Sequence, residues 1–158
     1  MEDTITVIGA GVIGGAIVKG LIKGGYKGKI IATRRRAERL KELEELGVST
    51  TSDNAKAAKE ADIVFICVKP NDVLKVVEEI KNFISGKLVI STAATIPLKH
   101  YKKVAPQARF VRSMPNVAIL VQESFTAYAC DNDVTSEDKE KVRKIFGILG
   151  CLLYTSDA

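Results

Sequence analysis

The sequence contains 158 residues, 46% of them hydrophobic, and its formal net charge at pH 7 is +5. This length and apolar content fit one compact domain with a single core. No apolar run approaches the roughly 18 residues of a membrane-spanning helix, so we expect a cytoplasmic protein without a membrane partner. The positive charges are mixed with glutamates along the predicted helices, and few aromatic residues lie among them. This pattern disfavours nucleic acid as a partner and favours a small polyanionic ligand.

The cysteine and histidine content argues against a metal site. Cys67, Cys130 and Cys151 lie far apart in the sequence and form no C-x-x-C pair. The single histidine, His100, cannot complete a zinc site with them. We therefore expect reduced cysteines and no bound metal, with Cys67 in the core.

The first predicted element is an apolar strand that ends at Ile8 and runs directly into the glycine pattern of residues 9–14, GAGVIG, which opens a helix. In this context G-x-G-x-x-G indicates a dinucleotide site. Gly9 permits a tight turn, Gly11 lets the backbone approach a pyrophosphate, and Gly14 lets the helix pack closely on the strand. The helix N-terminus favours an anion through its free N–H groups and its dipole. A glycine-rich turn without a ligand is the alternative.

Strands and helices alternate along the rest of the chain, as in β-α-β units. The predicted strands cover residues 29–33, 48–50, 63–68, 88–91, 108–114 and 125–130, and the predicted helices cover residues 37–46, 53–60, 71–83, 97–104 and 136–150. The last helix is expected to begin at a Ser-x-Asp cap formed by Ser136. Strand 63–68 is almost wholly apolar, which indicates burial on both faces. We therefore predict an α/β fold, a Rossmann-like doubly wound and mostly parallel sheet with helices on both faces.

The residues that follow the second predicted strand favour one cofactor over another. They read Thr33-Arg34-Arg35-Arg36. A carboxylate at this place binds the adenosine ribose of NAD, whereas arginine accommodates the 2′-phosphate of NADP. Guanidinium groups pair bidentately with phosphate, and the Thr33 hydroxyl can add a donor, so we predict an NADP site with Arg34 and Arg35 favoured over Arg36. The alternative is a basic start to a solvated helix, which the helix dipole opposes.

Three further segments occur in the order typical of one family: Val68-Lys69-Pro70, residues 90–94 (ISTAA) and residues 112–116 (RSMPN). With them, the chain from residue 5 to about residue 150 resembles pyrroline-5-carboxylate reductase. The resemblance covers only the nucleotide domain of that family. It is more specific than the glycine pattern, because it depends on several motifs in a fixed order.

The resemblance implies a role for each matching segment. The pyrophosphate would lie against the loop, the 2′-phosphate against the end of the second strand, the ribose near the third helix, and the nicotinamide half near the fourth strand. The implied cofactor-binding residues are Ile8, Gly9, Ala10, Gly11, Val12, Ile13, Gly14, Thr33, Arg34, Arg35, Asn54, Val68, Lys69, Pro70, Ala94 and Asn116. Several have a structural alternative: Asn54 in a helix start, Lys69 as a solvated strand end, Pro70 as a helix start, and residues 114–116 as an ordinary turn.

The resemblance also implies a reaction, the transfer of hydride from NADPH to the C=N carbon of 1-pyrroline-5-carboxylate, which gives L-proline. The substrate would be a small cyclic imine. No catalytic residue is identifiable in the chain. Ser91, Thr92 and Thr95 offer hydroxyls, but no His, Asp or Cys partners them in a nucleophilic arrangement, so a hydrolase is not supported.

We expect an NADP-binding domain over residues 1–150 and a short tail over residues 151–158. The first four tail residues can add an edge strand, and the tail resembles the spurious residues of truncated reading frames. The family continues into a helical domain that forms its homo-oligomer and supplies most of the substrate pocket, and this domain is not expected here. We therefore expect cofactor binding without full activity. Two alternatives stay open: a stand-alone NADP-binding module with an interaction or sensing role, and a deazaflavin-dependent NADP reductase.

Overall fold

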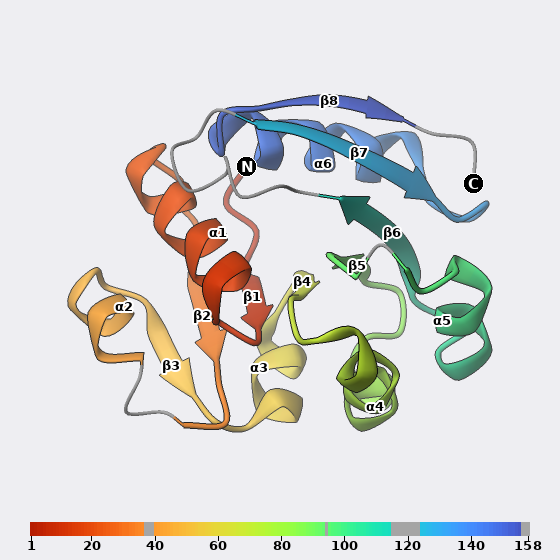
Figure 1. Ribbon diagram of the computed structural model, residues 1–158, viewed down its shortest axis with the longest axis horizontal. Helices are drawn as coiled ribbons and strands as arrows, with labels where there is room; N and C mark the ends of the chain where they lie inside the picture. The colour runs from red at the N-terminus through yellow and green to blue at the C-terminus, as the bar shows by residue number, and fades with distance from the viewer. Residues whose placement is uncertain (37–39, 94, 115–123, 156–158) are drawn as a thin grey trace.

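The computed structural model describes residues 1–36, 40–93, 95–114 and 124–155. Its helices are α1 (Val12–Lys23), α2 (Lys41–Glu45), α3 (Asn54–Glu60), α4 (Pro70–Ile80), α5 (Leu98–Val104) and α6 (Ser136–Ile148), with a 3₁₀ turn η2 (Lys81–Phe83). Its strands are β1 (Ile5–Ile8), β2 (Ile30–Thr33), β3 (Ser49–Thr51), β4 (Ile63–Ile66), β5 (Leu88–Ser91), β6 (Arg109–Met114), β7 (Ser124–Cys130) and β8 (Cys151–Thr155). The described strands form one sheet of eight in the order β3-β2-β1-β4-β5-β6-β7-β8 (Figure 1).

The sheet is parallel from β3 through β6, and only the pairing of β6 with β7 is antiparallel. β8 returns parallel to β7 and forms the edge of the sheet. In the sheet, β2 and β3 follow one another on one side of β1, whereas β4 lies on the other side of β1. This reversal is a topological switch point, the place where open α/β sheets bind ligands beyond the carboxyl ends of their strands.

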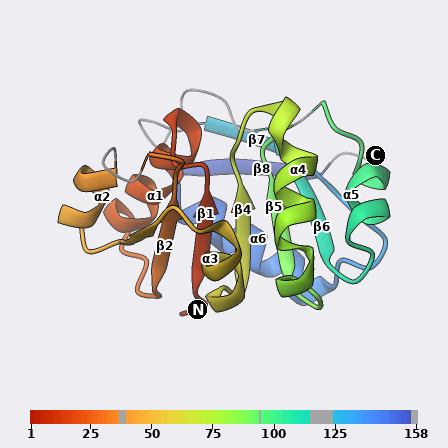
Figure 2. The same ribbon diagram turned by 90° about the horizontal axis from the view of Figure 1, so that it is seen from below.

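Two apolar layers enclose the sheet, one on each face. One layer packs α1, α2 and α6 against the strands, and the other packs α3, α4 and α5 against the opposite face. Figure 2 shows α3 and α4 on the near side of the sheet with α6 behind it. Phe65 of β4 meets Phe146 of α6 edge to face at a ring-centroid distance of 6.0 Å. The predicted doubly wound α/β fold is therefore confirmed.

The predicted elements are all present, and most of them differ from the prediction by a few residues at their ends. Helix α6 has its N-cap at Thr135 and not at Ser136, because a capping box joins residues three positions apart and Asp138 is the acidic partner. Strand β4 ends at Ile66, so Cys67 and Val68 belong to the following loop. α2 begins at Lys41, and residues 37–39 of the predicted helix lie outside the described residues.

The tail residues 151–155 form β8, in agreement with the predicted edge strand. In Figure 1 β8 lies at the opposite side of the sheet from β3. Among the helices that the structure describes, none has the length and apolar character needed to cross a membrane.

Candidate functional site

A cleft of about 360 Å³ opens at the carboxyl ends of β1, β2 and β4, at the switch point of the sheet. The ends of three strands, the start of α3 and one face of α4 form its walls. The predicted residues that line it are Ile8, Gly9, Gly11, Thr33, Arg34, Arg35, Asn54, Val68 and Lys69. The fold therefore brings together residues that lie up to 61 positions apart in the sequence.

The glycine loop turns sharply at the end of β1. Gly9 has a φ of +85°, a left-handed conformation that favours glycine. The N–H groups of Gly9 and Ala10 donate to the carbonyl oxygen of Thr33 at 3.1 and 2.8 Å, and the N–H of Gly11 donates to the carbonyl of Gly9 at 2.7 Å. These bonds hold the loop against the end of β2 and fix the start of α1.

The other two glycines of the pattern meet different surroundings. A Cβ on Gly14 would lie 2.5 Å from the carbonyl oxygen of Gly9 and 3.1 Å from Cβ of Cys67, so any larger residue there would force the loop or α1 to shift. A Cβ on Gly11 would meet no described atom within 4 Å. Packing therefore accounts for Gly14, whereas the space at Gly11 is open toward the cleft that it lines.

Helix α1 presents its N-terminus beside this open space. The first N–H groups of any α-helix have no acceptor within the helix, and the described first turn of α1 contains no acidic side chain. The side chain of Val12, the first residue of α1, is 71% exposed and does not cover this end. The arrangement suits an anion held by backbone N–H groups.

The charged side chains of the cleft are mostly basic. Arg34, Arg35, Lys69 and Lys75 line it together with two acids, Asp72 and Glu79. Among the described residues, none of the four basic side chains forms an ion pair. The excess positive charge attracts a polyanion, because a low-dielectric cleft concentrates the field of its charged walls.

Thr33 and Asn54 meet at the arginine end of the cleft. The Thr33 hydroxyl donates to Oδ1 of Asn54 at 2.6 Å, and its Oγ1 accepts from the N–H of Gly9 at 3.4 Å. Thr33 is fully buried. The Thr33 hydroxyl, predicted to donate to a phosphate, therefore donates to Asn54 in this structure. The donors that remain at this end of the cleft are the half-buried Arg34 and the exposed Arg35.

Sequence reasoning missed five residues that line the cleft: Cys67, Asp72, Lys75, Val76 and Glu79. Four of them lie on α4 with spacings of three, four and seven positions, which places them on one face of the helix. Val76 is one of the buried apolar residues of α4, whereas Asp72, Lys75 and Glu79 form a polar face beside it. Helical periodicity in the sequence could have grouped these three polar residues on one face, although it could not show the cleft that this polar face borders.

The remaining predicted residues lie around the cleft or cannot be placed. Ala10, Val12, Ile13 and Gly14 belong to the loop and the first turn of α1 but do not line the cleft, and Pro70 is the first residue of α4. Ala94 and Asn116 lie outside the described residues. Their predicted contacts with the cofactor stay predictions.

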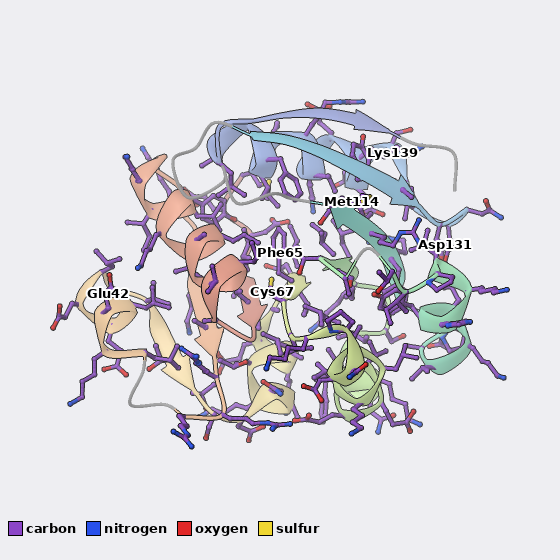
Figure 3. All side chains as sticks on the ribbon, in the orientation of Figure 1. Glu42, Phe65, Cys67, Met114, Asp131 and Lys139 are labelled. Carbon is purple, nitrogen blue, oxygen red and sulfur yellow. The ribbon has the colours of Figure 1, made fainter. Side chains whose placement is uncertain are left out.

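Cys67 forms part of the cleft wall, next to α1 in Figure 3. It packs against the core and is partly exposed, so the expected place in the core is only partly right, because the strand ends one residue earlier. Burial raises the pKa of the Cys67 thiol to about 12, although a hydrogen bond with Thr92 acts in the opposite direction. A neutral thiol is a poor nucleophile, so Cys67 contributes contact area to the wall.

The hydroxyl groups at the end of β5 serve the fold. Ser91 Oγ lies 2.6 Å from the Tyr101 hydroxyl and accepts from the N–H of Ala93 at 3.2 Å. Both Ser91 and Tyr101 are buried. Over the part of the chain that the structure describes, no group of His, Cys, Asp and Glu side chains is arranged to hold a metal ion.

Comparison with protein-family models matches residues 4–95 to the family described as NADP oxidoreductase, coenzyme F420-dependent. Among curated proteins, the pyrroline-5-carboxylate reductase of Methanosarcina acetivorans is 38% identical over 154 residues, which are 94% of this chain and 57% of that protein. The similarity expected from the V-K-P and M-P-N segments is thus confirmed.

Solved structures show the same fold. A pyrroline-5-carboxylate reductase from Coxiella burnetii has a TM-score of 0.93 at 33% identity and covers 100% of this chain and 60% of its own. The pyrroline carboxylate reductase of Plasmodium falciparum, solved with NADP bound, has a TM-score of 0.88 at 24% identity and covers 98% of this chain and 58% of its own. This second likeness supports the fold alone. The chain spans 57–60% of the length of these three relatives.

Proposed function

This chain belongs to the family of NADP oxidoreductases described as coenzyme F420-dependent, and we propose that it is the NADP-binding part of a pyrroline-5-carboxylate reductase. The full reaction would reduce 1-pyrroline-5-carboxylate to L-proline with NADPH. The observation that carries the proposal is the basic cleft at the β1–β4 switch point, in a chain similar to curated pyrroline-5-carboxylate reductases over almost its whole length.

The diphosphate of the cofactor would lie at the N-terminus of α1. The backbone N–H groups of Val12 and Ile13 and the helix dipole favour its negative charge. The open space at Gly11 is compatible with this placement, because a Cβ there would meet no described protein atom and Gly11 lines the cleft. Ile8, Ala10 and Gly14 would help to hold the loop in its conformation.

The 2′-phosphate of NADP would be bound by Arg34 and Arg35. Both side chains line the cleft and have no acidic partner among the described residues. A guanidinium group donates two parallel hydrogen bonds to phosphate oxygens, which gives direction as well as charge. Asn54, held by the Thr33 hydroxyl, would meet the adenosine ribose.

The nicotinamide half would lie near Val68, Lys69 and Pro70, and the resemblance to pyrroline-5-carboxylate reductase also implies contacts of the cofactor with Ala94 and Asn116. The bound cofactor would supply the hydride, and the role of the described residues would be to bind and orient the cofactor. We assign no proton donor among the described residues. Since the chain spans 57–60% of its relatives, we propose that residues 1–150 bind the cofactor and that binding of the imine substrate, as well as any homo-oligomer, depends on the rest of the relatives' length.

Calorimetric titration of the purified chain with NADPH and NADH tests the proposal. Replacing Arg34 by Ala should weaken NADPH binding about tenfold or more, because a charge-assisted phosphate contact is lost, and should change NADH binding little. Arg36→Ala is the matched control, since Arg36 carries the same charge in the same segment but does not line the cleft. Equal binding of both nucleotides by the unmodified chain would contradict the phosphate assignment, and binding of neither would contradict the proposed cofactor site.

The description of the matched family favours a second candidate, hydride exchange between NADP and the deazaflavin coenzyme F420. Loss of the deazaflavin's visible absorbance on mixing with NADPH and the protein would support it. No loss, together with specific NADPH binding, would leave the reductase proposal in place.

A further inference from the structure

Glu79 lies on α4 and lines the arginine end of the cleft. The arginines themselves follow β2, so they belong to a different part of the fold. Oε2 of Glu79 lies 3.5 Å from Nδ2 of Asn54, at the outer limit of a hydrogen bond, and Glu79 lines the cleft together with Arg34 and Arg35. A carboxylate is thus present at this end of the cleft, although β2 ends in a threonine and is followed by three arginines.

Glu79 sets the direction of a short chain of hydrogen bonds. A carboxylate can only accept, so Asn54 turns its NH₂ group to Glu79 and its carbonyl oxygen to Thr33. The Thr33 hydroxyl then donates to Asn54 and accepts from the loop N–H of Gly9. If the Asn54 amide were rotated by half a turn, its carbonyl oxygen would face the Glu79 carboxylate, which is also an acceptor. The Thr33 hydroxyl would then be free to donate elsewhere.

The charge of Glu79 acts differently on the two nicotinamide cofactors. A 2′-phosphate carries up to two negative charges and is repelled by a carboxylate in the same cleft, whereas the 2′-hydroxyl of NADH is neutral. A carboxylate also accepts a hydrogen bond from a ribose hydroxyl, which is the usual means by which such folds bind NAD. Both effects shift affinity toward NADH.

We propose that Glu79 is a specificity-determining residue that reduces the preference of the cleft for NADPH over NADH. The proposal rests on the NADP-binding function proposed above. It predicts that the arginines make the site selective for NADPH and that Glu79 limits this selectivity from α4, so that the cleft retains measurable affinity for both cofactors.

The test is calorimetric titration of the full chain and its variants with NADPH and with NADH at the same ionic strength. In Glu79→Gln the ratio of the NADH Kd to the NADPH Kd should rise by about threefold or more, a modest effect because Glu79 is exposed and its field is screened. Glutamine keeps an acceptor for Asn54, so loss of charge is separated from loss of the contact.

Glu78→Gln is the matched control. It makes the same change in net charge on the same helix, but Glu78 pairs with Lys81 at 2.5 Å and does not line the cleft. Its ratio should stay within about twofold of the unmodified chain, because exposed charges outside the cleft are screened. Glu79→Ala should raise the ratio as well, with weaker binding of both cofactors because Asn54 loses its acceptor.

A ratio that is unchanged or lower in Glu79→Gln would overturn the proposal. So would equal weakening of both cofactors, which would make Glu79 a support for Asn54 without an effect on specificity. If the unmodified chain binds neither nucleotide, the proposed function itself fails, and this outcome is separate because it is seen before any variant is compared.

Discussion

At the scale of single residues, the three glycines of the loop are required for different physical reasons. Gly9 adopts a positive φ, and Gly14 lies against the carbonyl of Gly9 and the side chain of Cys67. Gly11 has neither constraint, because its φ is −84° and the space beside it is open. Folding therefore constrains Gly9 and Gly14, whereas for Gly11 the constraint that we propose is cofactor binding.

The first prediction follows from this difference. Gly11→Ala should weaken NADPH binding about tenfold or more while changing the free energy of unfolding by less than about 1 kcal/mol, because its methyl group enters only the space needed by the ligand. Gly14→Ala should lower the free energy of unfolding by about 1–3 kcal/mol, because its methyl group overlaps the carbonyl of Gly9. Urea denaturation and calorimetry check both values. Unaltered NADPH affinity in Gly11→Ala would contradict the placement of the diphosphate.

At the scale of elements, the start of α6 is joined to β6 by a buried acid. Asp138 closes the capping box with Thr135, and its carboxylate accepts from Nε and Nη2 of Arg109 at 2.6 and 3.1 Å. Burial alone would raise the pKa of Asp138, but the hydrogen bonds from Arg109 and Thr135 outweigh it and hold the pKa below its usual value. The charged form is therefore the one that stabilises the fold.

The second prediction concerns the pH dependence of this contact. A carboxyl group whose pKa is lowered by folding adds stability above its unfolded pKa of about 3.9 and loses it as the pH falls through the folded value. Asp138→Asn should cost about 2 kcal/mol or more at pH 7, since Arg109 loses its charged partner. The difference from the unmodified chain should narrow below about pH 4.

Denaturant titrations between pH 7 and pH 3 measure this difference. Glu140→Gln is the control, because Glu140 pairs with Arg143 on the exposed face of the same helix. Its cost should stay below about 0.5 kcal/mol. A cost of Asp138→Asn that does not vary with pH would show that the charge of Asp138 is not the source of the stability.

At the scale of the whole molecule, the cleft and the tail lie in different parts of the sheet. β8 pairs with β7, and β5, β6 and β7 separate it from β4, whose end borders the cleft. The strands and helices that carry the cleft residues all precede residue 81. The tail can therefore affect stability without direct contact with the cofactor site.

The third prediction tests residues 1–150 as the binding unit. A chain that ends at Gly150 should bind NADPH within about twofold of the full chain, because distant and independent sites change separately. Its thermal midpoint should fall by several degrees, because β7 loses its pairing with β8 and becomes an exposed edge. If the shortened chain folds but no longer binds NADPH, the cofactor site depends on the tail and the proposed domain boundary is wrong.

Much of the fold could be predicted because its signals are local. The periodicity of a few consecutive residues predicts the apolar strand before Gly9 and the alternation of strands and helices. It also predicts β4, whose residues are apolar on both faces of the sheet. The predicted cap at Ser136 is wrong for a reason that is also local. Thr135 and Ser136 are both residue types that favour an N-cap, but only Thr135 has an acidic residue three positions later, Asp138, so the spacing in the sequence already favoured Thr135.

The sequence by itself determined the glycine loop, the basic segment at the end of β2 and the kind of sheet that joins them. Only the tertiary structure decided that the polar face of α4 borders the cleft, that the Thr33 hydroxyl is bonded to Asn54, and that Glu79 lines the same cleft as the arginines. Periodicity along a helix shows which residues share a face, but not what that face meets. That depends on the strand order of the sheet, which brings distant segments to the same edge.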